Sequence, residues 1–218
     1  MKNLVVAIDG PAGAGKSTVA QLAAKELGYT YIDTGAMYRA VAWKTLQRHE
    51  PVTDELILDV VKDIDVNLQY IDGKTRVTVG NDDVSALIRT PEVNAIVSQV
   101  AALGPARVKM VDLQRKMAER GSVLMDGRDI ATNVLPNADV KIFLTASIEE
   151  RAHRRWKEMK EKGYDIPLEK LQQDIAARDK ADSEREISPL VQAEDATLLD
   201  TTGISIEEVV ARILAMCQ

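Results

Sequence analysis

Residues 10–17, with the sequence GPAGAGKS, match the pattern G-x-x-x-x-G-K-S/T and combine glycines with a lysine and a hydroxyl group. Glycine lets the backbone wrap an anion with its N–H groups pointing inward, and a helix that follows adds its positive N-terminal end. In such a loop we expect Lys16 to reach the β and γ phosphates of a nucleoside triphosphate, and Ser17 to coordinate Mg²⁺. The alternative is a tight turn with a buried lysine. The residues expected to bind the triphosphate are Gly10, Pro11, Ala12, Gly13, Ala14, Gly15, Lys16, Ser17 and Thr18.

A second stretch that could do chemistry is AARDKADSEREISPL, residues 176–190. On a helix, Arg178, Asp182 and Arg185 recur at i, i+4 and i+7, so they form one stripe of guanidinium donors around a carboxylate. This stripe is typical either of a binding site or of an exposed ladder of ion pairs, each worth about 0.2–0.5 kcal/mol. The spacing alone leaves both interpretations open. The charged residues expected to face solvent are Asp179, Lys180 and Glu184.

The segments on either side of the glycine-rich loop predict the order strand, loop, helix. Residues 4–8 are a short apolar run, and 16–27 continue as an amphipathic helix that ends at Gly28. This context favours the phosphate-binding interpretation of the loop over a simple turn.

Other short β-rich runs along the chain are separated mostly by helical stretches. Buried strands that alternate with helices predict an α/β fold, with a parallel sheet of about five strands flanked by helices. Ligands of such sheets bind beyond the carboxyl ends of the strands. The further runs are 29–32, 122–125, 140–144 and 196–199, and the acidic residues at the ends of the runs are Asp9, Asp33, Asp126 and Asp200.

One region breaks the alternation of strands and helices. Residues 66–80 read as two strands around an Asp72-Gly73 turn, which predicts a small antiparallel hairpin insertion. Thr90 and Pro91 then have the types expected for the cap and first turn of a helix that runs to about residue 102. The Gly-Pro pair at 104–105 indicates the start of another helix. Two more starts are indicated by capping-box spacing, at Ser147 with Glu150 and at Ser205 with Glu208.

The composition limits the class of protein. With 218 residues, 45% of them hydrophobic and 28% charged, the chain can bury a substantial core. Its formal net charge of -6 argues against a general nucleic-acid binder, because affinity for phosphate backbones comes from basic surface. A small anionic ligand needs only local positive charge, which residues 151–162 supply.

No segment approaches the roughly 18 apolar residues of a membrane span, and the lone Cys217 fits a reducing compartment, so we expect a cytoplasmic protein.

A loop that binds nucleoside triphosphate is compatible with a switch, a motor or a phosphotransferase. A GTPase switch needs an Asn-Lys-x-Asp tetrad, which the sequence lacks, and motor ATPases carry domains for which 218 residues leave no room. We therefore favour a small kinase. At this point a nucleotide-dependent switch, and a kinase for UMP, AMP or a polyol, remain open as alternatives.

Five segments that together span almost the whole chain resemble bacterial cytidylate kinases. They are IDGPAGAGKST (8–18), DTGAMYR (33–39), MDGRDIAT (125–132), KIFLTASIEERAHRR (141–155) and ARDKADSER (177–185). The resemblance implies a P-loop nucleoside monophosphate kinase fold and, with Mg²⁺, transfer of the γ-phosphoryl of ATP to CMP or dCMP, giving CDP or dCDP. It also implies a single kinase domain, 1–218, with a core (about 1–34, 92–145 and 190–218), an acceptor-binding insertion (about 35–91) and a mobile helical lid (about 146–185).

The resemblance assigns acceptor-binding roles residue by residue. The positions that match those holding the acceptor phosphate are Thr34, Arg39 and Arg128. At position 34, Thr keeps the hydroxyl group of the Ser that relatives can carry. The positions that match those reading the cytosine edge are Ser98, Arg107 and Asp129. The positions that match those gripping the acceptor's sugar, phosphate and base are Arg178, Asp182 and Arg185. We expect a monomer whose partners are ATP and CMP or dCMP, with no nucleic acid and no membrane.

The chemistry of cytosine agrees with these assignments. Cytosine presents an amino donor beside a ring nitrogen and a carbonyl that accept, so its reader needs an acceptor, such as Asp129 or Ser98, and a cationic donor, such as Arg107. Uracil reverses the first two groups, and the mismatch is expected to cost about 1–3 kcal/mol. The residues alone leave alternatives open, because Arg107 can pair with Asp112 or Glu119, and Ser98 can be a small packing residue.

The acceptor also dictates the mechanism. A monophosphate oxygen is already anionic at neutral pH, so transfer needs no general base, and catalysis reduces to alignment and neutralisation of charge. Closure of the lid would exclude water from the phosphates. The alternative is that 151–162 is a solvated basic helix. The expected catalytic residues are Lys16, Arg128, Arg154 and Arg155, with Arg151 a further candidate and His153 a bystander.

Overall fold

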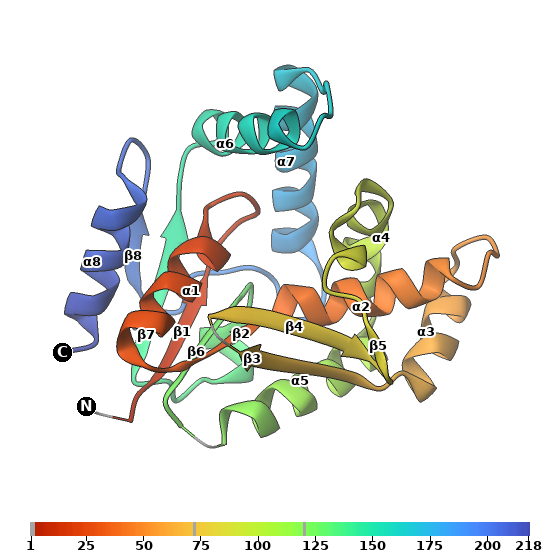
Figure 1. Cartoon of the computed structure of the whole chain (residues 1–218), viewed down its shortest axis with the longest axis horizontal. Coiled ribbons are helices and arrows are strands. Elements are labelled where there is room, and N and C mark those ends of the chain that lie inside the picture. Colours follow the sequence, from red (N-terminus) through yellow and green to blue (C-terminus); the bar gives the residue numbers. More distant parts are fainter. Residues whose placement is uncertain (1–2, 72, 120) are drawn as a thin grey trace.

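The computed structural model of the chain describes residues 3–71, 73–119 and 121–218, and its core is a five-stranded parallel sheet (Figure 1). The strand order is β2-β6-β1-β7-β8, so the strand that leads into the glycine-rich loop lies at the centre. Side chains of this central strand are buried on both faces, as expected where helices cover a parallel sheet. The strands are β1 (Val5–Asp9), β2 (Thr30–Asp33), β6 (Val123–Gly127), β7 (Val140–Thr145) and β8 (Thr197–Asp200).

The sheet confirms the predicted α/β class and parallel strand arrangement, with small differences at strand ends. β6 was expected to end at residue 125, yet pairing continues through Asp126, opposite Ile8, and Gly127, opposite Asp9. An aspartate followed by a glycine resembles a turn in sequence, whereas here backbone pairing with the central strand extends the strand. The extension places Asp126 beside the glycine-rich loop.

Helices cover both faces of the sheet. α1 (Lys16–Leu27) and α8 (Ile206–Met216) lie on one face, in a buried cluster that includes Ala20, Leu124 and Ile213. α5 (Gly104–Ala118) covers the opposite face. Because alternate residues of a strand point to opposite faces, Leu124 joins the first cluster and its neighbour Met125 the second.

A small antiparallel sheet lies beside the core and confirms the predicted hairpin insertion (Figure 1). β3 (Val66–Ile71) pairs with β4 (Lys74–Val79), and a short third strand, β5 (Asp82–Asp83), was not predicted. Asp72 of the expected turn lies outside the described residues. The tip of the hairpin contacts α1, because the Gln21 side chain donates to the Gly73 carbonyl at 2.7 Å.

Three further helices pack with this sheet and with α5 around a second core. They are α2 (Thr34–Leu46), α3 (Asp54–Asp63) and α4 (Pro91–Ala102). The predicted start of α4 is confirmed, since the Thr90 hydroxyl caps Val93 N at 3.4 Å. These helices bring segments far apart in sequence to the carboxyl edge of the parallel sheet.

α6 (Ile148–Glu161) and α7 (Leu168–Glu184) pack against each other above the glycine-rich loop (Figure 1). At the start of α6 the Ser147 hydroxyl accepts from Glu150 N at 3.1 Å, as the capping pattern predicts. The reciprocal half of the box is absent among the described contacts, because the Glu150 carboxylate pairs with Arg154 instead. Along the described residues, no helix combines the length and apolar character that crossing a membrane requires.

Candidate active site

The glycine-rich loop joins the central strand β1 to helix α1. Gly10 has φ 150° and lies so close to β7 that a Cβ there would meet the Leu144 carbonyl oxygen at 1.9 Å. Gly15, with φ 90°, precedes the first residue of α1 in a left-handed conformation that favours glycine. The loop therefore needs glycine for steric reasons at these positions, and it ends where the positive pole of a helix begins.

Lys16 is buried at the start of α1, with 6% of its surface exposed. Its Nζ donates to the Pro11 carbonyl at 2.7 Å, across the loop. Burial, and then the nearby Arg128 charge, hold the pKa of Lys16 well below its ordinary value. A polyphosphate in the loop would oppose both effects, so the site favours an anion over an empty loop.

Ser17 faces a carboxylate that the sequence did not link to it. Its Oγ donates to Asp126 Oδ2 at 3.0 Å, and Tyr31 donates to Asp126 Oδ1 at 2.8 Å. Burial raises the pKa of Asp126 to about 6. Adjacent hydroxyl and carboxylate oxygens fit Mg²⁺, which is usually held by one or two carboxylates together with substrate phosphates. Only the three-dimensional pairing of β6 with β1 brings Asp126 to the loop.

Two arginines of α6 contact the backbone of the loop. Arg151 Nη1 donates to the Ala12 carbonyl at 2.9 Å and pairs with Asp179 of α7 at 2.7 Å. Arg154 Nη1 lies 3.4 Å from the Ala14 carbonyl. The interpretation of this helix as merely solvated is therefore wrong for these side chains, and Asp179, expected to face solvent, is instead an ion-pair partner with 23% of its side chain exposed.

Several other residues of the two helices interact within their own helix. Arg155 pairs with Glu158 within α6 at 2.9 Å, so in this conformation its guanidinium is engaged within its own helix. His153 stacks on Trp156, with ring centroids 5.8 Å apart. The expected solvent-facing pair Lys180 and Glu184 is exposed, with its charges 4.0 Å apart.

The turn after β6 is fixed to β1 by a buried carboxylate. Asp9 accepts hydrogen bonds at 2.8 Å from the backbone N–H groups of both Ile130 and Ala131. These N–H groups open a π-helical turn, Ile130–Val134. Burial raises the pKa of Asp9 to about 6. Asp9 lies, as expected, at a strand end where ligands of such sheets bind, and the structure shows that its carboxylate holds the neighbouring turn.

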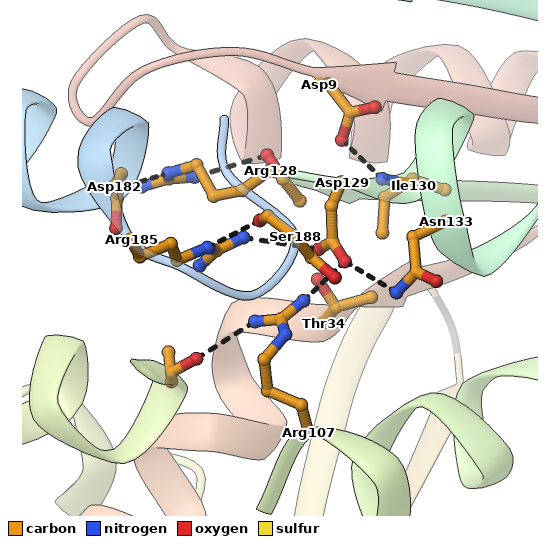
Figure 2. Close-up of polar contacts among 12 residues, drawn as sticks. Asp9, Thr34, Arg107, Arg128, Asp129, Ile130, Asn133, Asp182, Arg185 and Ser188 are labelled. Atoms are coloured by element: carbon orange, nitrogen blue, oxygen red, sulfur yellow. Dashed lines mark hydrogen bonds and ion pairs between the residues drawn. The ribbon is translucent and has the colours of Figure 1, made fainter. Parts of the chain in front are cut away.

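Asp129 lies in this turn, buried between a cation of α5 and a cation that follows α7 (Figure 2). Arg107 of α5 forms an ion pair with Asp129 Oδ2, and Asn133 donates to the same oxygen at 3.0 Å. Arg185 Nη2 lies 3.6 Å from Asp129 Oδ1. The pairing of Arg107 with Asp112 or Glu119, left open by the sequence, is therefore wrong.

The predicted stripe of Arg178, Asp182 and Arg185 is only partly helical. α7 ends at Glu184, and Arg185 follows it with an extended backbone, ψ 142°, so i+7 spacing does not apply to it. Its side chain nevertheless turns back toward Asp129. Asp182 pairs with Arg128 at 2.8 Å, which joins α7 to the turn after β6.

Arg39, Arg128 and Arg178 form a cluster of like charge beside Lys16. Burial, Arg128 and Arg39 lower the pKa of Arg178 to about 9, and its Nε is buried without a hydrogen-bond partner among the described residues. Burial also lowers the pKa of Arg39, whose Nε donates to Asn94 at 3.3 Å. Converging cations without enough counter-charges form a site for an anion.

The remaining predicted residues border this cluster. Thr34 begins α2, and its hydroxyl donates to the Asp126 carbonyl at 2.7 Å. Ser98 is half-buried on α4, one helical turn after Asn94 and therefore on the face that reaches Arg39. Asn94 and Asn133 had no signal of their own in the sequence, because an isolated asparagine has no spacing that points to a partner.

A glycine-rich loop after a central parallel strand, a lysine at the following helix, and a facing cluster of arginines define a P-loop kinase. Comparison with known proteins gives the family. A family model described as cytidylate kinase matches residues 6–218, and the chain belongs to this family.

Relatives of similar length carry the same name. The chain is 52% identical over 216 residues to the cytidylate kinase of Bacillus cereus (strain ATCC 10987 / NRS 248), covering 99% of this chain and 96% of that protein. The cytidylate kinase of Bacillus thuringiensis (strain Al Hakam) gives the same identity and coverage. A crystal structure of an uncharacterized protein from Eubacterium ventriosum ATCC 27560 superposes with a TM-score of 0.54 at 12% identity, over 98% of this chain and 97% of that one. That likeness concerns the fold alone.

Proposed function

We propose that the protein transfers the γ-phosphoryl group of ATP to CMP or dCMP, giving CDP or dCDP. Membership of the cytidylate kinase family supports this proposal. The single observation that carries it is the buried pair of Arg107 and Asp129 next to the cluster of Arg39, Arg128 and Arg178. A donor and acceptor pair beside a phosphate-sized cationic site suits a nucleoside monophosphate whose base has an amino group.

On the donor side, the loop residues 10–18 would bind the phosphates of ATP through backbone N–H groups. Lys16 would exchange its contact with the Pro11 carbonyl for the β and γ phosphates. Ser17 and Asp126 would hold Mg²⁺, which supplies charge neutralisation on the transferring group when bound. Arg154, which already contacts the loop, is the lid arginine better placed for the donor phosphates than Arg155.

On the acceptor side, the arginine cluster would bind the phosphate of CMP, with Thr34 at its edge. Asp129 would accept from the cytosine amino group, while Arg107 and Ser98 complete the reading of the base edge. Asp182 and Arg185 come from the α7 end of the pocket, where Asp182 suits a sugar hydroxyl. This partition keeps the reacting phosphate between the arginine cluster and Lys16.

The chemical step then needs alignment more than proton transfer. The attacking oxygen of the acceptor is an anion, so no general base is assigned. Lys16, Arg128 and the lid arginines would stabilise the charge that spreads over the transferring group, and helices α6 and α7 would exclude water as they close. We assign about 35–91 to acceptor binding, about 146–185 to the lid and about 1–34, 92–145 and 190–218 to the core, in a cytoplasmic monomer.

A phosphotransfer assay across nucleoside monophosphates tests the proposal. ATP with Mg²⁺ is supplied, and the ribo- and deoxyribo- forms of the common nucleoside monophosphates are compared as acceptors. We expect CMP and dCMP to have the highest kcat/KM. Absence of turnover with both would overturn the proposal, and nucleotide binding without transfer to any acceptor would favour a switch.

A further inference from the structure

The hydrogen bonds to the Asp129 carboxylate reach only one of its two oxygens (Figure 2). Its Oδ2 oxygen accepts from both Arg107 Nη2 and Asn133 Nδ2. Its Oδ1 oxygen lies 3.6 Å from Arg185 Nη2, which is too long for a hydrogen bond. Within the described part of the chain, Oδ1 is therefore the oxygen left for a ligand.

This arrangement leaves Arg107 incompletely paired. Arginine and carboxylate commonly pair side by side, with two parallel hydrogen bonds. Here Arg107 Nη1 donates to the Ala101 carbonyl at 3.0 Å, and the buried Nε has no hydrogen-bond partner among the described residues. An unpaired buried donor is costly and calls for an explanation. Another group must oppose rotation of the Asp129 carboxylate into the side-by-side pair.

Asn133 is the group in the right place. It belongs to the π-helical turn Ile130–Val134, whose first N–H groups are bound by Asp9. The far end of the turn is bound by Arg115, which donates to the Asn133 and Val134 carbonyls at 2.7 and 3.0 Å. Because the turn is anchored at both ends, the Asn133 amide is a fixed donor on Oδ2.

We propose that Asn133 is a positioning residue for base discrimination. By holding Oδ2 it keeps Oδ1 of Asp129 turned toward the acceptor base, and so favours an exocyclic amino group over a carbonyl. Without this amide we expect the Asp129 carboxylate to rotate into a side-by-side pair with the Arg107 guanidinium. The Oδ1 acceptor and an Arg107 N–H donor would then bind each other and would no longer be available to the base. The inference rests on the proposed function, because the base of the acceptor is the ligand of Oδ1.

The test compares Asn133→Ala with a matched control, Arg115→Ala, which loosens the same turn from its exposed side. We expect Asn133→Ala to lower the CMP over UMP ratio of kcat/KM by about tenfold, mainly through KM for CMP, as expected for losing one hydrogen bond to a charged group. KM for ATP is expected to stay unchanged. Arg115→Ala is expected to lower the melting temperature and to keep the ratio. Titration calorimetry with CMP and UMP, without ATP, gives a readout separate from turnover.

A double-mutant cycle separates positioning from general loosening of the turn. In an Asp129→Asn background, Asn133→Ala is expected to cause no further loss of preference, because the carboxylate it orients is gone. Three results would overturn this inference. They are a CMP over UMP ratio of kcat/KM that is unchanged in Asn133→Ala, a ratio that falls equally in Arg115→Ala, and effects on the ratio that are additive in the cycle. A wild-type protein without preference for CMP over UMP would instead overturn the proposed acceptor, and the two failures are thus distinguishable.

Discussion

The glycine-rich loop and the group of charged side chains beside it are built in different ways. This group, called the arginine pocket below, comprises Arg39, Arg107, Arg128, Asp129 and Arg178. The loop is a contiguous backbone structure whose lysine already has a partner, the Pro11 carbonyl. The pocket collects charged side chains from α2, α5, the turn after β6 and α7, and it leaves Arg107 Nε and Arg178 Nε without partners among the described residues. The Lys16 ammonium group thus has a hydrogen-bond partner within the loop, whereas the pocket combines buried guanidinium nitrogens that lack partners among the described residues with like charges that repel one another.

The largest expected effect lies on the loop side. Lys16→Ala removes the cation that we propose to lie nearest the transferring phosphates, and we expect kcat to fall by at least about 10³-fold. Binding of CMP, measured by calorimetry, should remain. If the folded variant no longer bound CMP, the loop and the arginine pocket would not bind their ligands independently of each other.

The next effect lies on the pocket side. Asp129→Asn replaces the carboxylate that we propose as the acceptor for the cytosine amino group, and we expect the CMP over UMP ratio of kcat/KM to fall by about 10- to 100-fold. KM for ATP is the internal control and should barely move. A fall in ATP affinity instead would assign Asp129 to the donor side.

The pH dependence of acceptor binding sharpens the comparison further. In the free protein the pKa of Arg178 is lowered to about 9 by burial and by Arg128, so its charge is lost as pH rises through that value. Because an acceptor phosphate favours the charged form, CMP affinity should fall above about pH 9 and be constant below it. Calorimetric titrations between pH 7.5 and 10 measure this, and Arg178→Gln should flatten the fall. An equal pH dependence in that variant would contradict the assignment.

The smallest effect is on stability. Arg178→Met relieves repulsion within the cluster, and we expect the melting temperature of the free protein to rise by about 3 °C. Inorganic phosphate should stabilise the wild type and have less effect on the variant. Lys180→Met, on the exposed face of the same helix, is the matched control and should change stability by less than about 0.5 kcal/mol. A drop in melting temperature for Arg178→Met would show that the pocket is not strained by its own charges.

The difference in construction also explains what the sequence could predict. The loop and the start of α4 were predictable because their signals lie within a few consecutive residues. The parallel sheet was predictable because short β-rich runs alternate with helical stretches along the chain. The partners of Arg107 and Ser17 were not, because Asp129 and Asp126 reach them only when β6 pairs with β1. Arg185 was expected on a helical stripe, yet α7 ends one residue earlier and the side chain returns from an extended segment. Spacing within one helix cannot describe a pocket assembled from several elements.

The central position of β1 has a consequence for how the chain folds. Val5 pairs with Val123 and Val6 with Val140, so both neighbours of the first strand are synthesised long after it. The entropy cost of closing such long loops comes before the stabilisation from strand pairing, so a high contact order predicts slow folding. Synthesis proceeds at about 5–20 residues per second, so β1 and the glycine-rich loop after it have no partner strand until β6 has been made. The first motif of the chain to be made therefore gains its first partner strand only after residue 123 has been synthesised.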